Sequence, residues 1–163
     1  MTKSDKLQII IRPIEEADRP VVISLWEEFI DYHKKREIEF NLVDEASKVY
    51  SSYLNEILKK QDNCLLVAEV EGNIAGYILG GILKTTGFFK HDKIGRITEI
   101  FVREDYRKNS IADSLLEEII EWFRERGILR IETDYYIKNK GAELFWKKTG
   151  FVPERTFLVY DRS

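Results

Sequence analysis

Hydrophobic residues recur along this chain at two spacings, one typical of strands and one typical of helices. Short runs rich in β-branched and aromatic residues predict strands, and apolar residues three or four positions apart predict amphipathic helices. Strands are predicted at 7–14, 63–70, 73–83, 96–102, 129–135 and 156–160. Helices are predicted at 15–35, 44–60, 111–126 and from Asn139 onward.

This order of elements predicts one α+β domain over residues 1–163. Glu71-Gly72 is a hairpin signal between the strands at 63–70 and 73–83. Hairpin and helix connections thus both occur, which is typical of a three-layer α/β/α arrangement with a mixed, mostly antiparallel central sheet and helices on both faces. No linker, repeat or low-complexity segment marks a domain boundary. In the helix at 44–60 the residues predicted to face inward are Val49, Tyr53, Leu54, Ile57 and Leu58.

The segment from Arg96 to Gly127 points to chemistry. An apolar strand, interrupted by Glu99, leads into a basic turn and then into a long amphipathic helix. Asn109 or Ser110 is placed to cap that helix, and Gly127 is placed to end it. Such a turn directs backbone N–H groups and the positive end of the helix dipole at one spot. That spot suits an anion, and phosphate above all.

Composition narrows the classes of partner. Lys and Arg total 26 and Asp and Glu total 29, so the net charge is −3, which gives no electrostatic reason to expect a nucleic-acid or membrane partner. Hydrophobic residues make up 44% of the chain, enough to pack a core at this length. No signal peptide or 18-residue apolar run is present, so a cytoplasmic protein is expected.

Cysteine and histidine give no sign of a metal site. Cys64 is the sole cysteine and stands in an apolar run, which favours a buried thiol over a nucleophile. His33 and His91 lack the spacing of paired ligands, so no metal is expected. His33, beside Tyr32, either borders a substrate pocket or lies at the surface.

Two short motifs together identify a family resemblance. The chain contains neither G-x-x-x-x-G-K-[ST] nor G-x-G-x-x-G. The turn instead reads Arg107-x-x-Ser110-x-Ala112, and a later stretch reads Asn139-x-x-Ala-x-x-x-Trp146-x-x-x-Gly-Phe. The first resembles the coenzyme A pyrophosphate loop of the GNAT superfamily of N-acetyltransferases, Gln/Arg-x-x-Gly-x-Gly/Ala. The second resembles that family's Asn-x-x-Ala-x-x-x-Tyr-x-x-x-Gly-Phe, and the order of the predicted elements is similar to the GNAT fold.

The resemblance implies an N-acetyltransferase that moves the acetyl group of acetyl-coenzyme A directly to a primary amine in a ternary complex. The acceptor amine belongs to a small molecule or a protein. The amides of residues 108–112 would hold the pyrophosphate, and a backbone N–H around Phe101 or Val102 would polarise the thioester carbonyl. The implied cofactor-binding residues are Phe101, Val102, Arg107, Lys108, Asn109, Ser110, Ile111, Ala112, Asn139 and Trp146.

Glu99 is the candidate catalytic base, acting directly or through a water. An ammonium group is no nucleophile, so the acceptor must lose a proton before it attacks. Glu99 is a carboxylate in an otherwise apolar strand, where burial would raise its pKa toward working pH. The alternative is an edge-facing or salt-bridged carboxylate, with Arg96 as the partner.

The group that protonates the departing thiolate is left open. Trp146 stands where the family commonly has a tyrosine, and an indole N–H is far too weak an acid. Either Tyr106, Tyr135 or Tyr136 serves, or the thiolate leaves unassisted. Trp146 would then pack against the cofactor or the core, while Asn139 contacts the cofactor, caps the last helix, or does both.

Ser110 and Trp146 stand where the family motifs have glycine and tyrosine. These two differences favour an alternative function, a non-catalytic coenzyme A-binding or regulatory module on the same fold. A nucleotide-binding domain would require a phosphate loop that the sequence lacks. The acceptor is expected to contact the first two helices and the loop at 84–93. Dimerisation is common in the family, so the resemblance leaves a homodimer open.

Overall fold

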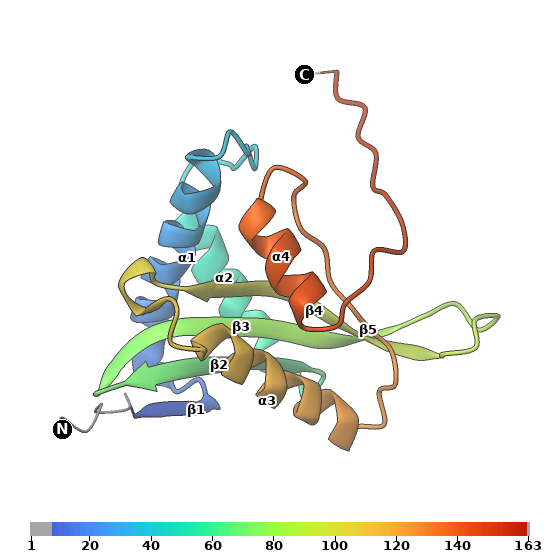
Figure 1. Cartoon of the computed structure of the whole chain (residues 1–163), viewed down its shortest axis with the longest axis horizontal. Helices are drawn as coiled ribbons and strands as arrows, with labels where there is room; N and C mark the ends of the chain where they lie inside the picture. The colour runs from blue at the N-terminus through green and yellow to red at the C-terminus, as the bar shows by residue number, and fades with distance from the viewer. Residues whose placement is uncertain (1–7, 163) are drawn as a thin grey trace.

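A five-stranded sheet runs through the middle of the protein, and its strands lie side by side in chain order (Figure 1). This computed structural model describes residues 8–162. The strands are β1 (Ile9–Pro13), β2 (Asn63–Val70), β3 (Asn73–Lys84), β4 (Lys93–Val102) and β5 (Ile131–Glu132). Neighbours from β1 to β4 are antiparallel and β5 is parallel to β4, which confirms the predicted mixed sheet. The predicted first strand began at Leu7, which lies outside the described residues.

Helices cover both faces of the sheet, as predicted. α1 (Arg19–Lys34) and α2 (Ala46–Ile57) pack on one face, and α3 (Ile111–Glu125) and α4 (Lys140–Lys148) pack on the other (Figure 1). Each pair of helices closes its own apolar cluster against the sheet, so burial on both faces holds the three layers together. Short 3-10 turns at Glu16–Asp18 and Glu104–Tyr106 precede α1 and α3.

A β-bulge in β4 decides which residues face which helices. The pairing with β3 skips Thr98, which becomes the extra residue of the bulge. Because the bulge breaks the two-residue alternation of a strand, Ile97 and Ile100 both pack on the side of α3. Glu99 and Phe101 face α1 and α2 instead. The bulge therefore turns the one carboxylate of this apolar run away from the α3 core.

The sheet opens between β4 and β5. The two strands pair only at Gly95 with Ile131 and at Arg96 with Glu132. Beyond this point β4 continues to Val102, whereas the chain after β5 leaves the sheet on its way to α4 (Figure 1). Among residues 8–162, no strand therefore lies beside the second half of β4 on this edge. The strand predicted at 129–135 is confirmed only at Ile131–Glu132.

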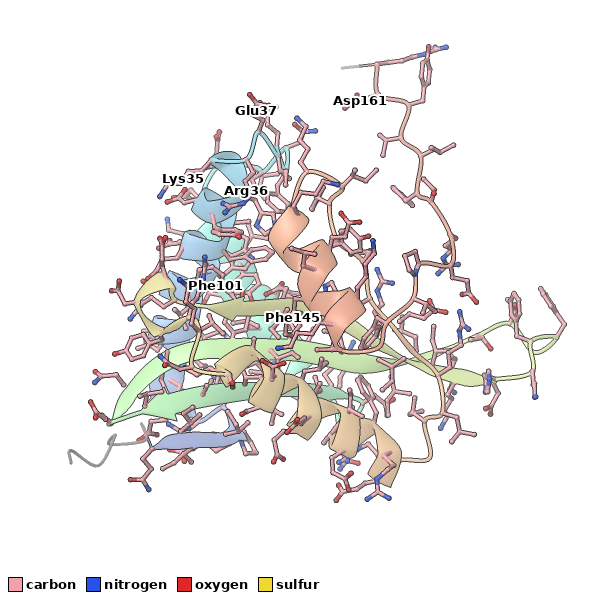
Figure 2. The ribbon with its side chains drawn as sticks, viewed as in Figure 1. Lys35, Arg36, Glu37, Phe101, Phe145 and Asp161 are labelled. Carbon is pink, nitrogen blue, oxygen red and sulfur yellow. The ribbon has the colours of Figure 1, made fainter. Side chains whose placement is uncertain are left out.

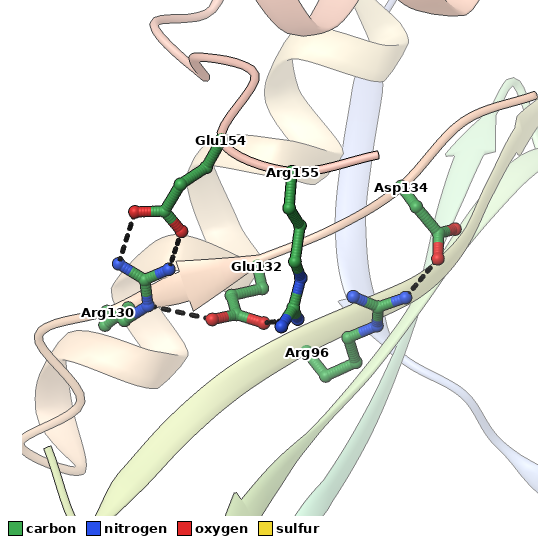
Figure 3. Close-up of polar contacts among 6 residues, drawn as sticks. All are labelled: Arg96, Arg130, Glu132, Asp134, Glu154 and Arg155. Atoms are coloured by element: carbon green, nitrogen blue, oxygen red, sulfur yellow. Dashed lines mark hydrogen bonds and ion pairs between the residues drawn. The ribbon is translucent and has the colours of Figure 1, made fainter. Parts of the chain in front are cut away.

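The strand predicted at 156–160 is wrong, since these residues form no strand. Ion pairs of Arg130 with Glu154 and of Glu132 with Arg155 hold the preceding chain beside β5 (Figure 3). The chain then departs from the sheet (Figure 1). Composition alone misled the prediction, because strand propensity reports how well a residue fits a sheet and not whether a neighbouring strand is present. The apolar side chains are left 75–88% exposed, at Phe157, Leu158, Val159 and Tyr160.

The inward face of α2 differs from the prediction by a small rotation. Tyr50, Leu54 and Ile57 are buried, a spacing of four and three that keeps them on one stripe. Val49 and Tyr53, both predicted to face inward, are 57% and 45% exposed. This rotation of α2 places the Tyr50 side chain inside the protein.

Local backbone geometry confirms two of the predicted breaks. Gly127 has a φ of +71° and ends α3, and Glu71 and Gly72 both have positive φ at the hairpin between β2 and β3. Cys64 is buried, and burial raises the pKa of its thiol to about 11, so the thiol is a core group and not a reactive one. Over the described part of the chain, no helix is long and apolar enough to span a membrane.

Candidate active site

The turn between β4 and α3 carries backbone N–H groups that have no acceptor within the helix. The first helical hydrogen bond of α3 runs from Ser114 N to Ser110 O, at 3.0 Å, so the N–H groups just before Ser114 have no acceptor within the helix. Lys108 and Ser110 have φ values of +68° and +58°. Such alternation into the left-handed region folds successive N–H groups around one point. Residues 108–112 therefore lie together at the positive end of α3, as predicted for an anion site.

The conformation of Ser110 leads to a stability prediction. A side chain in the left-handed region costs roughly 1–2 kcal/mol, which glycine avoids. Ser110 is the N-cap residue, but its side chain makes no capping hydrogen bond to any described residue. We expect Ser110→Gly to raise the free energy of unfolding by about 0.5–1 kcal/mol, measured by chemical denaturation. Ser114→Gly, within the regular helix, is the matched control and should lower it by about the same amount. A loss of stability in Ser110→Gly would contradict the argument.

Arg107 links this turn to β4 and to α1. Its Nε donates to Val102 O at 2.9 Å, and its guanidinium lies 4.5 Å from the ring centre of Tyr32 and 5.6 Å from that of Phe101. Tyr32 reaches the first turn of α4, since a Cβ on Gly141 would lie 3.5 Å from the Tyr32 hydroxyl. The structure thus brings together the end of β4, the turn, α1 and the start of α4 at the opening of the sheet.

One backbone donor is directed into that opening. Arg103 N donates to Ala75 O at 2.8 Å, so the Arg103 N–H points toward β3. Because successive residues of a strand point their backbone groups to opposite edges, the N–H and C=O of Val102 point away from β3. The contact between Val102 O and Arg107 agrees with this orientation. Of the two donors expected from the sequence, around Phe101 and Val102, the Val102 N–H is therefore the one that faces the open edge.

Asn139 and His33 form a buried pair beneath the start of α4. Asn139 Oδ1 accepts from Ala142 N at 3.1 Å and caps the helix, and Asn139 Nδ2 lies 3.3 Å from His33 Nε2. His33 Nδ1 donates to Phe29 O at 2.8 Å, which leaves Nε2 as the acceptor. Burial lowers the pKa of His33 and favours this neutral form. The capping role is confirmed and a surface position for His33 is wrong, whereas a cofactor contact of Asn139 stays a prediction.

Trp146 lies in the core on the α3 side. It is 4% exposed, and its ring packs at 5.1 Å from Phe145 and 4.9 Å from Phe151. Figure 2 shows Phe145 on α4 and Phe101 at the end of β4. Core packing was one of the two roles expected of Trp146, and a cofactor contact stays a prediction. The two lysines after it form ion pairs, Lys147 with Glu143 and Lys148 with Asp113.

The alternative tyrosine acids take different positions. Tyr106 and Tyr135 are partly buried against the core cluster of α3. Tyr136 is 46% exposed, and its ring lies 5.9 Å from that of His33. Desolvation, followed by the charge of Asp134, raises the pKa of Tyr136, which makes it a weaker acid than usual.

Glu99 is held by two tyrosine hydroxyls on the α1–α2 side of the sheet. Tyr50 Oη and Tyr77 Oη lie 2.7 Å and 2.8 Å from Glu99 Oε2. Burial raises the pKa of Glu99, as expected, while both hydroxyl donors favour the charged form and oppose that shift. Arg96 pairs with Asp134 (Figure 3), so the structure does not support Arg96 as the partner of Glu99.

Sequence reasoning missed Tyr50 and Tyr77 as parts of this site. The predicted inward face of α2 was rotated relative to the observed one, so Tyr50 was not expected to be buried. Tyr77, fully buried in β3, did carry a signal, because a phenol hydroxyl inside an apolar strand needs a partner. Glu69 and Glu99 were the carboxylates predicted in the strands at 63–70 and 96–102, so the sequence offered two candidate partners for Tyr77 and did not choose between them.

A hollow of about 330 Å³ lies on the same side of the sheet, between α1 and the start of α2. The ring of Trp26 forms part of its wall and stacks on Tyr50, with ring centres 4.3 Å apart. Its lining mixes apolar and charged side chains, from Trp26, Glu27, Ile30, Asp31, Lys34, Leu42, Val43, Ala46 and Ser47. Among the described residues, no group of three or more His, Cys, Asp or Glu side chains is arranged to hold a metal ion.

Comparison with known proteins agrees with this geometry. An uncharacterized N-acetyltransferase of Methanocaldococcus jannaschii is 30% identical over 99 residues, which cover 61% of this chain and 43% of that protein. Another, of Archaeoglobus fulgidus, is 27% identical over 112 residues, covering 68% and 67%. The matched region thus spans less than half the length of the Methanocaldococcus jannaschii protein. An aminoglycoside N-acetyltransferase in complex with CoA shares the fold, with a TM-score of 0.78 at 15% identity over 99% of both chains.

The family model matches most of the chain. Residues 23–151 match the model of the acetyltransferase (GNAT) family, which covers most of the chain and both motifs. The resemblance found in the sequence is thereby confirmed, and this chain belongs to the acetyltransferase (GNAT) family.

Proposed function

We propose that the protein is an N-acetyltransferase that transfers the acetyl group of acetyl-coenzyme A directly to a primary amine within a ternary complex. One observation carries the proposal: β4 bears the Glu99 carboxylate and ends at a turn of open N–H groups at the start of α3. A single strand thus joins a candidate base to a candidate pyrophosphate site. Family membership supports the same reaction.

In the proposed reaction, residues 108–112 bind the pyrophosphate through backbone N–H groups and the helix dipole. The Val102 N–H donates to the thioester carbonyl as its oxygen gains charge. Glu99 takes a proton from the acceptor ammonium, and the free amine attacks the carbonyl carbon. The C–S bond breaks and the thiolate of coenzyme A leaves. The attacking nitrogen gives up a second proton, to the departing thiolate or to solvent, and the neutral amide forms. Glu99 faces α1 and α2, so the amine would approach from that side and the thioester from the open edge of β4.

The hollow beside α1 is the proposed entrance for the acceptor. In its lining Asp31 pairs with Lys34, so Glu27, which forms no ion pair among the described residues, would attract a cationic amine. Trp26 connects the hollow to Tyr50 and hence to Glu99. A solved structure with the same fold is an aminoglycoside N-acetyltransferase with a bisubstrate analogue, CoA-S-monomethyl-acetylneamine. An amino sugar is therefore the first acceptor to test, followed by a polyamine, free lysine and a peptide N-terminus.

The alternative is a coenzyme A-binding module without catalysis. It is favoured by Ser110 in a strained conformation and by Trp146 in the core, where the family's usual acid is missing. Turnover with any amine would exclude it.

The test is acetyl-coenzyme A binding by calorimetry, followed by thiol release with the amine panel. We expect a dissociation constant in the range of about 1 μM to 1 mM, typical of enzyme substrates, and thiol release that depends on the amine. Binding without turnover across the panel would favour the module. Absence of heat at millimolar acetyl-coenzyme A would overturn both.

A further inference from the structure

The two tyrosines that contact Glu99 do so on a single oxygen. Both hydroxyls donate to Oε2, at 2.7 Å from Tyr50 and 2.8 Å from Tyr77. A carboxylate oxygen has two lone pairs, so these donors occupy Oε2 and leave Oε1 without either of them. The contact is therefore asymmetric, with one oxygen held by the protein and the other left for a different partner.

The other oxygen, Oε1, has no hydrogen-bond partner among the described residues. Glu99 keeps part of its surface exposed, and every fully buried side-chain N or O atom of the described residues has a hydrogen-bond partner. No described residue forms a hydrogen bond with Oε1, so Oε1 has contact with solvent. Oε1 is therefore the oxygen of Glu99 that a bound acceptor could contact.

The two donors are themselves held by different elements. Tyr77 is 0% exposed in β3, directly opposite Phe101 of β4. Tyr50 is 6% exposed in α2, and its ring is nearly parallel to that of Trp26 in α1, with an angle of 11° between the planes. Neither hydroxyl can move far without disturbing core packing. The sheet and the helices together thus fix the position of the carboxylate.

We propose that Tyr50 and Tyr77 are positioning residues for Glu99: they hold Oε2, stabilise the ionised carboxylate and aim Oε1 at the acceptor amine. This inference rests on the proposed function, in which Glu99 is the base. Charge-assisted hydrogen bonds from two hydroxyls stabilise the carboxylate more strongly than its protonated form. Without them, the buried carboxyl would hold its proton up to a higher pH.

The titratable groups that face Glu99 are few. They are Tyr50 and Tyr53 from α2 and Tyr77 from β3, while α1 contributes the uncharged Trp26 through its stack on Tyr50. No Lys or Arg of residues 8–162 forms an ion pair with Glu99. Tyr53 is 45% exposed, and the charge of Glu99 adds to desolvation in raising the pKa of Tyr53. Because Tyr53 lies near Glu99 and makes no hydrogen bond to it among the described residues, Tyr53→Phe is a matched control.

The experiment measures the ionisation of Glu99 directly. Protein labelled with ¹³C at the glutamate carboxyl groups is titrated by NMR, and the Glu99 signal is assigned by its loss in Glu99→Gln. In Tyr50→Phe and in Tyr77→Phe, we expect the midpoint of the Glu99 titration to rise by about one pH unit. In Tyr53→Phe the midpoint should stay where it is. Thermal unfolding of each variant verifies the fold, and Tyr50→Phe keeps the ring that stacks on Trp26.

Turnover provides the second readout, with acetyl-coenzyme A and the most active amine of the panel. A base acts only above its own pKa, so a raised pKa moves the acid limb of kcat/KM to higher pH. We expect that limb to move by the same amount as the NMR midpoint in each Tyr→Phe variant, with the KM for acetyl-coenzyme A unchanged. A general loss of stability would not produce this shift.

The outcomes separate this inference from the proposed function. Unshifted midpoints in both Tyr→Phe variants would overturn the positioning role, whatever the activity. Shifted midpoints with an unshifted acid limb would also overturn it, because Glu99 would then be held but not used. Full activity in Glu99→Gln would remove Glu99 as the base, while the NMR titration would still report whether the tyrosines hold its charge.

Discussion

Replacement of Glu99 by Gln is expected to lower kcat/KM for acetyl transfer by about 10²- to 10⁴-fold, the usual contribution of a general base. Gln has nearly the same shape, and its carbonyl oxygen can accept the hydroxyls of Tyr50 and Tyr77 as Glu99 Oε2 does. The variant therefore keeps the packing but loses the group that takes the proton. Acetyl-coenzyme A affinity, measured by calorimetry, should be unchanged, because the turn at 108–112 is not altered.

The pH dependence of this defect provides a sharper test. A primary amine has a pKa near 10, so the fraction of neutral amine rises with pH and the need for a base falls. The ratio of wild-type to Glu99→Gln kcat/KM should therefore shrink as pH rises. Glu71→Gln, in the hairpin turn between β2 and β3, is a matched control that should behave as wild type. If Glu99→Gln keeps wild-type kcat/KM at neutral pH, Glu99 is not the base.

A negative charge at Ser110 is expected to weaken acetyl-coenzyme A binding by about 100-fold, or roughly 2.7 kcal/mol, through repulsion of the pyrophosphate. Ser110→Asp is suited to the test because Asp tolerates the left-handed conformation that Ser110 adopts, with φ of +58°. An acidic residue is also favourable at a helix N-terminus. The fold of the variant should therefore be retained while the anion site is lost.

Ser110→Asn is the control for this substitution, since Asn has the same size and the same tolerance of positive φ but no charge. We expect its dissociation constant to stay close to that of the wild type. The defect of Ser110→Asp should shrink at high salt, because screening weakens repulsion between exposed charges. Equal affinities of the Asp and Asn variants would show that the pyrophosphate does not bind at this turn.

Much of the architecture could be predicted because its signals are local. Periods of two and of about 3.6 residues mark strands and helices wherever they occur, and β1 to β4 and α1 to α4 all lie where those periods indicate. The breaks at Gly127 and at Glu71-Gly72 could be predicted for the same reason, because the preference for a positive φ belongs to a single residue. The turn at 107–112 was found through its motif, and its left-handed residues explain why the family prefers glycine at the position of Ser110.

What the sequence could not determine depends on partners that are distant along the chain. Strand propensity at 156–160 was real, but within residues 8–162 no neighbouring strand pairs with this segment, so a strand does not form there. The bulge at Thr98 decides that Glu99 faces α2 and not α3, and it exists only in the pairing of β4 with β3. A surface position was one of two alternatives for His33, because nothing near it in sequence shows that Asn139 will cover it.

The amino-acid sequence by itself determined the order of the elements from β1 to α4, the helix N-terminus that suits an anion, and Glu99 as the candidate base. Those features belong to contiguous residues, so their spacing and backbone preferences can be read directly from the order of residues along the chain. The tertiary structure alone decided that Tyr50 and Tyr77, from a helix and from the adjacent strand, meet on one oxygen of Glu99. It alone decided that the Val102 N–H faces an open edge, because an unpaired strand edge results from where β4 and β5 separate.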